Sequence, residues 1–188
     1  QMIDYEAIIS KYCSGNIELQ QIILTHSRQV ADRALAILAT HPEWAESGEI
    51  DPVFVEEAAM LHDIGVVFCD APRIHCFGKH AYIEHGYLGA EILRQEGLSK
   101  HASVAERHTG TGIDVEQIMR EQLPIPLQDY TPRTLEEKLI CYADKFYSKT
   151  KLGQEKPMSK IRLHLWKYGS DTVNRFDEMQ RFFEPQNA

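Results

Sequence analysis

The chain has 188 residues, of which 43% are hydrophobic, and a formal net charge of −8; this predicts a soluble globule, most simply a single domain over residues 1–188. The acidic balance excludes a general binder of polymeric nucleic acid, which needs a clustered basic surface, and no apolar stretch approaches the roughly 18 residues of a membrane span. The four cysteines are scattered without a close Cys-x-x-Cys pair, which fits reduced thiols, and the N-terminus has no secretory pattern. We therefore expect a cytoplasmic protein.

Apolar residues recur with helical spacing along most of the chain. This spacing predicts helices over about 3–13, 17–39, 52–62, 81–96, 99–108, 114–123, 134–149, 159–168 and 170–183. Residues able to cap these helices are Asn16, Asp51, Ser99, Asp114 and the capping box Thr134-Leu-Glu-Glu137. No run of period two is long enough for a sheet, so the predicted fold class is all-α.

Two segments break the helical pattern before the site residues are considered. The segment around His41-Pro42 and Gly48 is expected to be a loop. Residues 66–80 lack a clean period, and we predict a functional loop or lid there. Its basic residues Arg73 and Lys79 are candidates to contact a substrate.

The dipeptide His62-Asp63 stands at the end of an apolar run, in the context His-Asp-Ile-Gly. Taken alone, such a pair is more often a capping histidine followed by a solvated carboxylate. Asp144 changes this, because its helical neighbours are apolar and an unpaired buried carboxylate costs several kcal/mol. Lys145 points about 100° away and is expected to be a poor partner for Asp144. A divalent metal shared with His26, which lies on an apolar stripe, would satisfy all of these groups.

Two further histidines extend the pattern. His85 is followed one turn later by Gly89, which removes side-chain bulk where a helix or ligand could approach. His108 precedes a turn that contains Gly110 and Gly112. Each histidine alone fits a surface or capping role. Together with the other groups, they would make a ligand set rich in nitrogen and oxygen that suits a first-row divalent ion.

The order of His26, His62-Asp63 and Asp144 in Tyr-Ala-Asp-Lys resembles the HD superfamily of metal-dependent phosphohydrolases. The resemblance covers about residues 20–150, and His85 and His108 resemble the dinuclear branch, which includes the diadenosine tetraphosphate hydrolases. It implies an all-α HD-domain helical bundle with the metal site between helices, followed by a helical extension over about 157–184.

The resemblance also implies roles for the six residues. His26, His62, Asp63 and Asp144 would hold one metal, and His85 and His108 would hold a second that Asp63 bridges. The cofactors would be two divalent ions, with iron as the first choice and Mn, Co, Ni, Zn or Mg as the other candidates. The Gly-Tyr-Pro element of cyclic-di-nucleotide phosphodiesterases is missing after His108, which argues against that substrate.

The expected reaction is hydrolysis of a phosphate ester or anhydride, in a nucleotide or dinucleoside polyphosphate, by attack of a metal-bound hydroxide. Asp63 and Lys145 are the candidate catalytic residues. Thr109 and Arg107, together with the loop residues Arg73 and Lys79, are candidates to neutralise phosphate charge. The partner is therefore a small phosphorylated molecule rather than a polymeric nucleic acid or a membrane.

Other functions and residues stay open at this point. The same ligands would serve a di-iron oxygenase, and a regulator that binds a nucleotide without cleaving it is a third hypothesis. A homodimer through the apolar C-terminal helices is compatible with the pattern, although core packing explains those helices equally well. The remaining histidines are expected to be surface or packing residues, except that two could reach the site from the loop: the first group is His41, His101 and His164, and the second is His75 and His80.

Overall fold

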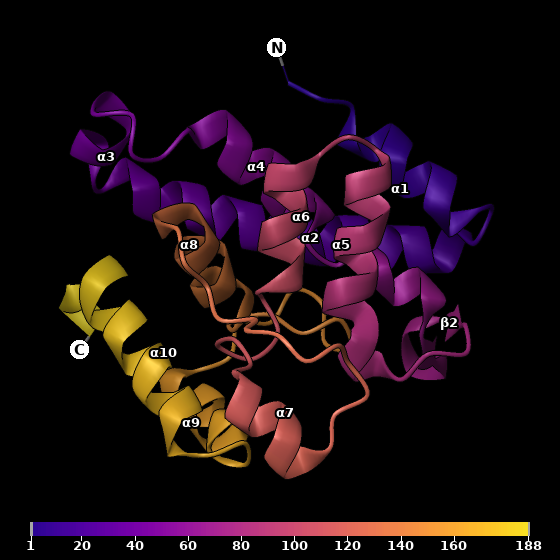
Figure 1. Ribbon diagram of the computed structural model, residues 1–188. Helices are drawn as coiled ribbons and strands as arrows, with labels where there is room; N and C mark the ends of the chain where they lie inside the picture. Colours follow the sequence, from indigo (N-terminus) through magenta and orange to yellow (C-terminus); the bar gives the residue numbers. More distant parts are fainter. Residues whose placement is uncertain (1, 188) are drawn as a thin grey trace.

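The computed structural model describes residues 2–187 and has an all-α fold (Figure 1), as predicted. The α-helices are α1 Tyr5–Cys13, α2 Ile17–Ala39, α3 Pro42–Glu46, α4 Pro52–Leu61, α5 His85–Gln95, α6 Ser99–Glu106, α7 Val115–Glu121, α8 Leu135–Asp144, α9 Met158–Trp166 and α10 Ser170–Phe183. The 3-10 segments are η1 Ile64–Phe68, η2 Pro72–Ile74, η3 Tyr82–Glu84 and η4 Pro185–Asn187. The strands β1 Asp70–Ala71 and β2 Cys76–Phe77 pair antiparallel, with Asp70 opposite Phe77.

Local capping chemistry explains where several helices begin. The side chains of Asn16, Asp51 and Asp114 each accept a hydrogen bond from a backbone N–H in the first turn of α2, α4 and α7. Thr134 and Glu137 form the predicted capping box of α8. Such caps each contribute about 1 kcal/mol, and these four predictions are confirmed.

Other local predictions were wrong. Ser99 is the first residue of α6 and makes no cap, because Leu98 occupies the N-cap position. The expected loop at His41-Pro42 contains α3, in which Pro42 presets the first helical turn. The helix predicted to reach Lys149 ends at Asp144, and α6 ends at Glu106 rather than at residue 108. The 66–80 segment is not a plain loop, since η1, η2 and the β1–β2 pair lie within it.

The long helix α2 runs through the centre of the helical assembly, and α5 and α6 lie side by side as a hairpin (Figure 1). The main hydrophobic core takes buried residues from α1, α2, α4, α5, α6, α8, α9 and α10, including Tyr5 near one end of the chain and Phe183 near the other. Ile118 of α7 packs in a smaller separate cluster with Ile113 and Tyr130. The ring of Tyr142 in α8 stacks on Phe176 of α10 at a centroid distance of 5.5 Å. The helix α10 is therefore packed against the helix that ends at Asp144, and α9 packs against α10.

A close backbone contact joins η1 to α5. A β-carbon built on Gly65 would lie 1.9 Å from the carbonyl oxygen of His85 and 2.5 Å from the amide nitrogen of Gly89. A β-carbon on Gly89 would in turn lie 3.1 Å from the nitrogen of Gly65. Two glycines thus allow η1 to touch α5, which confirms that Gly89 marks a close approach and brings Asp63 next to His85.

Among residues 2–187, none of the helices has the length and hydrophobicity needed to cross a membrane.

Candidate metal centre

Four side chains converge from three separate parts of the fold. His26 comes from the middle of α2, His62 and Asp63 follow α4, and Asp144 ends α8. The Nε2 atom of His26 lies 3.0 Å from Asp63 Oδ2 and 3.0 Å from Asp144 Oδ1. The Nε2 atom of His62 lies 3.1 Å from the same two oxygens. One ligand atom from each of these residues lies within 4.8 Å of the others, which is the spacing of a metal-binding group.

A second group shares Asp63 with the first. Its other carboxylate oxygen, Oδ1, lies 3.3 Å from His85 Nε2 and 3.1 Å from His108 Nε2. The two imidazole nitrogens are 3.0 Å apart. His85 is the first residue of α5 and His108 follows α6, so the helical hairpin holds both rings. The Asp63 carboxylate therefore faces one group with each oxygen, in the arrangement that a bridging ligand requires.

The main chain fixes the orientation of three of the rings. The Nδ1 atoms of His62, His85 and His108 lie 2.5 to 2.7 Å from the carbonyl oxygens of the residues three positions earlier. A carbonyl only accepts, so each Nδ1 carries the hydrogen and donates it. In a neutral imidazole the lone pair is then on Nε2, the atom that faces Asp63. Histidine ligands of metal ions are typically oriented in this way.

The charges at the site fit a cation. Burial, together with His62 and His85, lowers the pKa of His108 to about 4 against the opposing effect of Asp63. The Nε2 atom of His108 therefore offers a lone pair at neutral pH. Asp63 Oδ1, which is buried, has no hydrogen-bond partner among the described residues. Electron-pair donors that face one another in a buried space, without a proton between them, are stabilised by a positive ion.

The carboxylates of the first group stay ionised. Burial opposes their charge, but Lys149 and a protonated His62, whose own pKa is raised to about 10 by Asp63 and Asp144 against burial, hold the pKa of Asp63 well below its usual range. A metal ion bound here would replace that proton on His62 Nε2. Lys145, with His26 and His62, does the same for Asp144. Both carboxylates are thus in the form that binds metal ions.

Two lysines lie against these carboxylates. The Nζ atom of Lys145 is 2.6 Å from Asp144 Oδ2 and donates to the carbonyl of His108 at 2.9 Å. The prediction that Lys145 is a poor partner was wrong, because α8 ends at Asp144 and the long lysine side chain bends back to the carboxylate. The Nζ atom of Lys149 is 2.8 Å from Asp63 Oδ2. The centre therefore has cationic side chains at its rim.

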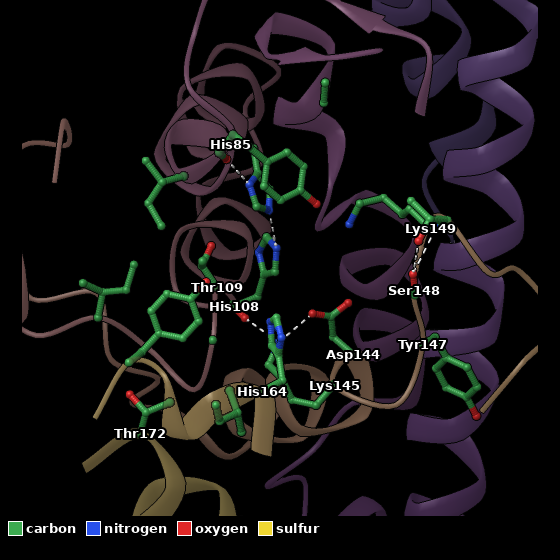
Figure 2. Close-up of a pocket in the computed structure, with 18 of the residues that line it drawn as sticks. His85, His108, Thr109, Asp144, Lys145, Tyr147, Ser148, Lys149, His164 and Thr172 are labelled. Atoms are coloured by element: carbon green, nitrogen blue, oxygen red, sulfur yellow. Dashed lines mark hydrogen bonds and ion pairs between the residues drawn. The ribbon is translucent and has the colours of Figure 1, made fainter. Parts of the chain in front are cut away.

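A cavity of about 720 Å³ opens over the centre. Figure 2 shows His85 and His108 on one side of it, with Asp144 and Lys149 on the other. Its basic lining residues are Arg73, Lys145, Lys149 and Lys156. Among the described residues that line it, Asp144 is the only carboxylate. An open space of this size next to an ion site can accept a small anionic molecule.

The predicted substrate-contact residues divide into two pairs. Thr109 and Arg73 line the cavity. Lys79 is exposed and lies outside it. Arg107 is also outside, because its guanidinium donates to both carboxylate oxygens of the buried Glu137 at 2.9 and 3.0 Å. Of this set, only Thr109 and Arg73 are placed to meet a bound molecule.

The other histidines mostly have structural surroundings. His41 stacks on Trp44, and His101 is paired with the buried Glu57 at 2.9 Å. His75 and His80, the two that could have reached the site, are exposed and do not line the cavity. His164 is exposed, as expected for a surface residue, and it also lines the cavity.

Several cavity residues were not identified from the sequence. Lys149 and Lys156 follow α8, and Tyr82 precedes α5. The run of lysines that begins at Lys145 was visible, but it resembles a solvated surface segment. Because α8 ends at Asp144, this segment leaves the helix, and its residues line the cavity.

These features define a helical protein with a buried histidine and aspartate centre that could hold divalent ions. Comparison with known families agrees: the HD domain model matches residues 23–148, and the chain belongs to this family. The histidines and aspartates of both groups lie within the matched range.

The curated relatives include proteins with quite different names. The chain is 38% identical to an uncharacterized protein of Methanocaldococcus jannaschii over 146 residues, which are 77% of this chain and 74% of that protein. It is 32% identical over 127 residues to a tRNA (cytidine(56)-2′-O)-methyltransferase of Thermoplasma volcanium, and 36% identical over 99 residues to the enzyme of that name from Picrophilus torridus.

The two methyltransferase matches cover 67% and 52% of this chain but only 32% and 25% of the methyltransferases. The chain therefore spans about a third or a quarter of their length. No solved structure matches.

Proposed function

We propose that the protein is a metal-dependent phosphohydrolase that cleaves a phosphate ester or anhydride in a small molecule, most simply a nucleotide or dinucleoside polyphosphate. The observation that carries the proposal is the sharing of Asp63 between two metal-type groups, beneath a cavity lined by four basic side chains and one carboxylate. Membership of the HD domain family supports it.

The six histidines and aspartates of the two groups would bind the metal ions. Asp63, with His26, His62 and Asp144, would hold one ion, and the same aspartate with His85 and His108 would hold the other. Two divalent ions supply polarisation of a phosphoryl oxygen and activation of a water molecule. The nitrogen and oxygen ligands suit iron and manganese, and also cobalt, nickel, zinc or magnesium.

The chain's own side chains would orient the substrate. Lys145 holds the Asp144 carboxylate and also donates to the carbonyl of His108, so it fixes the position of ligands from both groups. Lys149, Arg73 and Thr109 line the space above. Their ammonium, guanidinium and hydroxyl groups would donate to phosphoryl oxygens, which lowers the energy of charge that develops there.

The similarity to the two methyltransferases supports only a shared HD region. The family model covers most of this chain, residues 23–148. The residues outside it are too few to contain a 127-residue match, so at least half of that match lies within the HD domain. This supports the view that those longer proteins contain an HD region similar to this chain. We therefore propose that this chain does not transfer methyl groups, and that its phosphohydrolase reaction belongs to nucleotide or RNA metabolism.

A substrate panel tests the proposal. Protein loaded with Fe²⁺, Mn²⁺ or Mg²⁺ is incubated with nucleotides, dinucleoside polyphosphates and phosphate esters, with and without oxygen, and phosphate release is measured. We expect release with redox-inactive metals and without oxygen. The matched control is Asp63→Asn, which should abolish release. A folded, metal-loaded protein that releases no phosphate from any compound would contradict the proposal.

The comparison of assays with and without oxygen tests a second candidate function, a di-iron oxygenase. The same six ligands suit a di-iron centre that activates oxygen. Consumption of oxygen that requires iron, with no phosphate release under manganese, would favour an oxygenase. Tight nucleotide binding without product would favour a regulator.

A further inference from the structure

One wall of the cavity is built by residues that follow the HD match. The family model ends at residue 148, and the cavity is lined beyond it by Lys149, Lys156 and His164 among others. These residues lie between α8 and the end of α9, which packs against α10. Apart from Lys149, which contacts Asp63, this wall lies outside the candidate ligand set, so substrate specificity could be determined here.

Lys156 differs from the other two lysines in the cavity. The Nζ atom of Lys145 lies 2.6 Å from Asp144, and that of Lys149 lies 2.8 Å from Asp63. Lys156 is half-buried and forms no ion pair with any carboxylate of residues 2–187. It is nevertheless held in place, because its backbone N–H donates to the carbonyl of Phe146 at 2.8 Å and Pro157 follows it.

The surroundings of this ammonium group are unfavourable for its charge. Burial and the neighbouring ammonium groups of Lys145, Lys149 and Lys160 lower the pKa of Lys156, and Asp144 opposes them only in part. A half-buried cation beside like charges gains stability when an anion binds next to it. The cavity is the space through which such an anion would reach it.

We propose that Lys156 binds a second anionic group of the substrate, separate from the phosphoryl group that lies at the metal centre. The preferred substrate then carries at least two phosphates, as a diphosphate or a longer phosphate chain does. A substrate with one phosphate would use only the metal centre and its nearest lysines. This inference rests on the proposed function and narrows its substrate class.

A binding experiment tests the proposal without requiring turnover. The probes are inorganic phosphate and methylenediphosphonate, a diphosphate analogue that is not hydrolysed, and calorimetry measures their binding to manganese-loaded protein freed of excess metal. We expect Lys156→Gln to weaken methylenediphosphonate about tenfold or more and to leave phosphate unchanged, since a charge-assisted hydrogen bond to the second group is lost. Lys156→Arg should retain the tighter binding.

Lys151→Gln is the matched control, because Lys151 is exposed on the same segment and does not line the cavity. Metal content and thermal midpoint are measured for every variant after titration. A Lys156→Gln protein that binds both probes as the wild type does, or that loses both equally, overturns the proposal.

The kinetic counterpart is a selective rise in KM for diphosphate substrates with kcat unchanged. Failure of the hydrolase proposal gives a different result, namely no phosphate release from any compound while the analogue still binds through Lys156.

Discussion

The backbone of Gly65 packs against the carbonyl oxygen of His85, so closely that a β-carbon on Gly65 would lie 1.9 Å from that oxygen. This contact sets the distance between the segment that carries Asp63 and the helix that begins with His85. Because a backbone carbonyl cannot move aside as a flexible side chain does, any side chain at position 65 must separate the two elements.

Gly65→Ala is therefore expected to destabilise the protein by about 3 kcal/mol or more and to lower its metal content. Gly86→Ala is the graded control, since its β-carbon would meet the nearest atom at 3.2 Å. Denaturant unfolding and elemental analysis measure the two effects. Equal stability of the Gly65 and Gly86 variants would show that η1 and α5 are free to shift apart.

The shared carboxylate predicts unequal effects of ligand substitution. His108→Gln removes a ligand of one group only and should lower the metal content from two ions to one. Asp63→Asn affects both groups, so it should lower the content toward zero. His80→Gln, at an exposed histidine outside both groups, should leave it unchanged. Two ions retained by the Asp63→Asn protein would contradict a bridging role.

Arg107 is expected to support the fold rather than the substrate. Its bonds to the buried Glu137 join the end of α6 to the start of α8. Arg107→Met should destabilise the protein by about 2 kcal/mol, the scale for a hydrogen bond to a charged group. The KM should not change, because Arg107 does not line the cavity. A raised KM with unchanged stability would instead indicate that Arg107 contacts the substrate.

Removal of the metal should lower thermal stability without loss of helix. Each ion present at about 100 times its dissociation constant stabilises the folded state by about 2.7 kcal/mol, which corresponds to about 5–10 °C per ion in a chain of this size. Treatment with a chelator is expected to shift the midpoint by this amount for each ion removed and to leave the far-ultraviolet circular dichroism unchanged. A collapse of the helical signal would mean that the ions are needed for folding.

Burial of Cys13 predicts a loss of stability in alkaline solution. Burial raises the pKa of this thiol to about 11, whereas an exposed cysteine titrates near 8.5. The folded state thus favours the neutral thiol, so the contribution is complete below about pH 8.5 and is lost as the pH rises toward 11. Chemical unfolding between pH 7 and 10.5 measures it. Cys13→Ala should show a shallower decline, and an identical slope in both proteins would exclude this source.

Much of the histidine and aspartate cluster could be predicted because its members have distinctive local patterns. Asp144 and His26 stand on apolar helical faces, where a polar side chain needs a partner. The pairing of His85 with His108 was implied by family resemblance, and the structure places their Nε2 atoms 3.0 Å apart. The helices followed from apolar spacing and caps, since both depend on residues a few positions apart.

The cavity wall could not be predicted in the same way. Lys149 and Lys156 line the cavity from a segment in which Glu155 is bound by Arg33 of α2, the same arginine that binds Glu184 after α10. Such a link joins residues more than 100 positions apart, and no local pattern reports it. Lys145 was misjudged for a related reason: helical geometry fixes the direction of a β-carbon, but it does not fix the end of a long side chain.

The hydrogen bonds from the Nδ1 atoms of His62, His85 and His108 have an evolutionary consequence. Their acceptors are the main-chain carbonyls of Ala59, Tyr82 and Ala105, and every residue type supplies such a carbonyl. Substitution at these three positions leaves the acceptor in place as long as the helix forms. The path of the backbone thus sets the orientation of the three imidazole rings, so the centre can persist while the amino acids around it diverge.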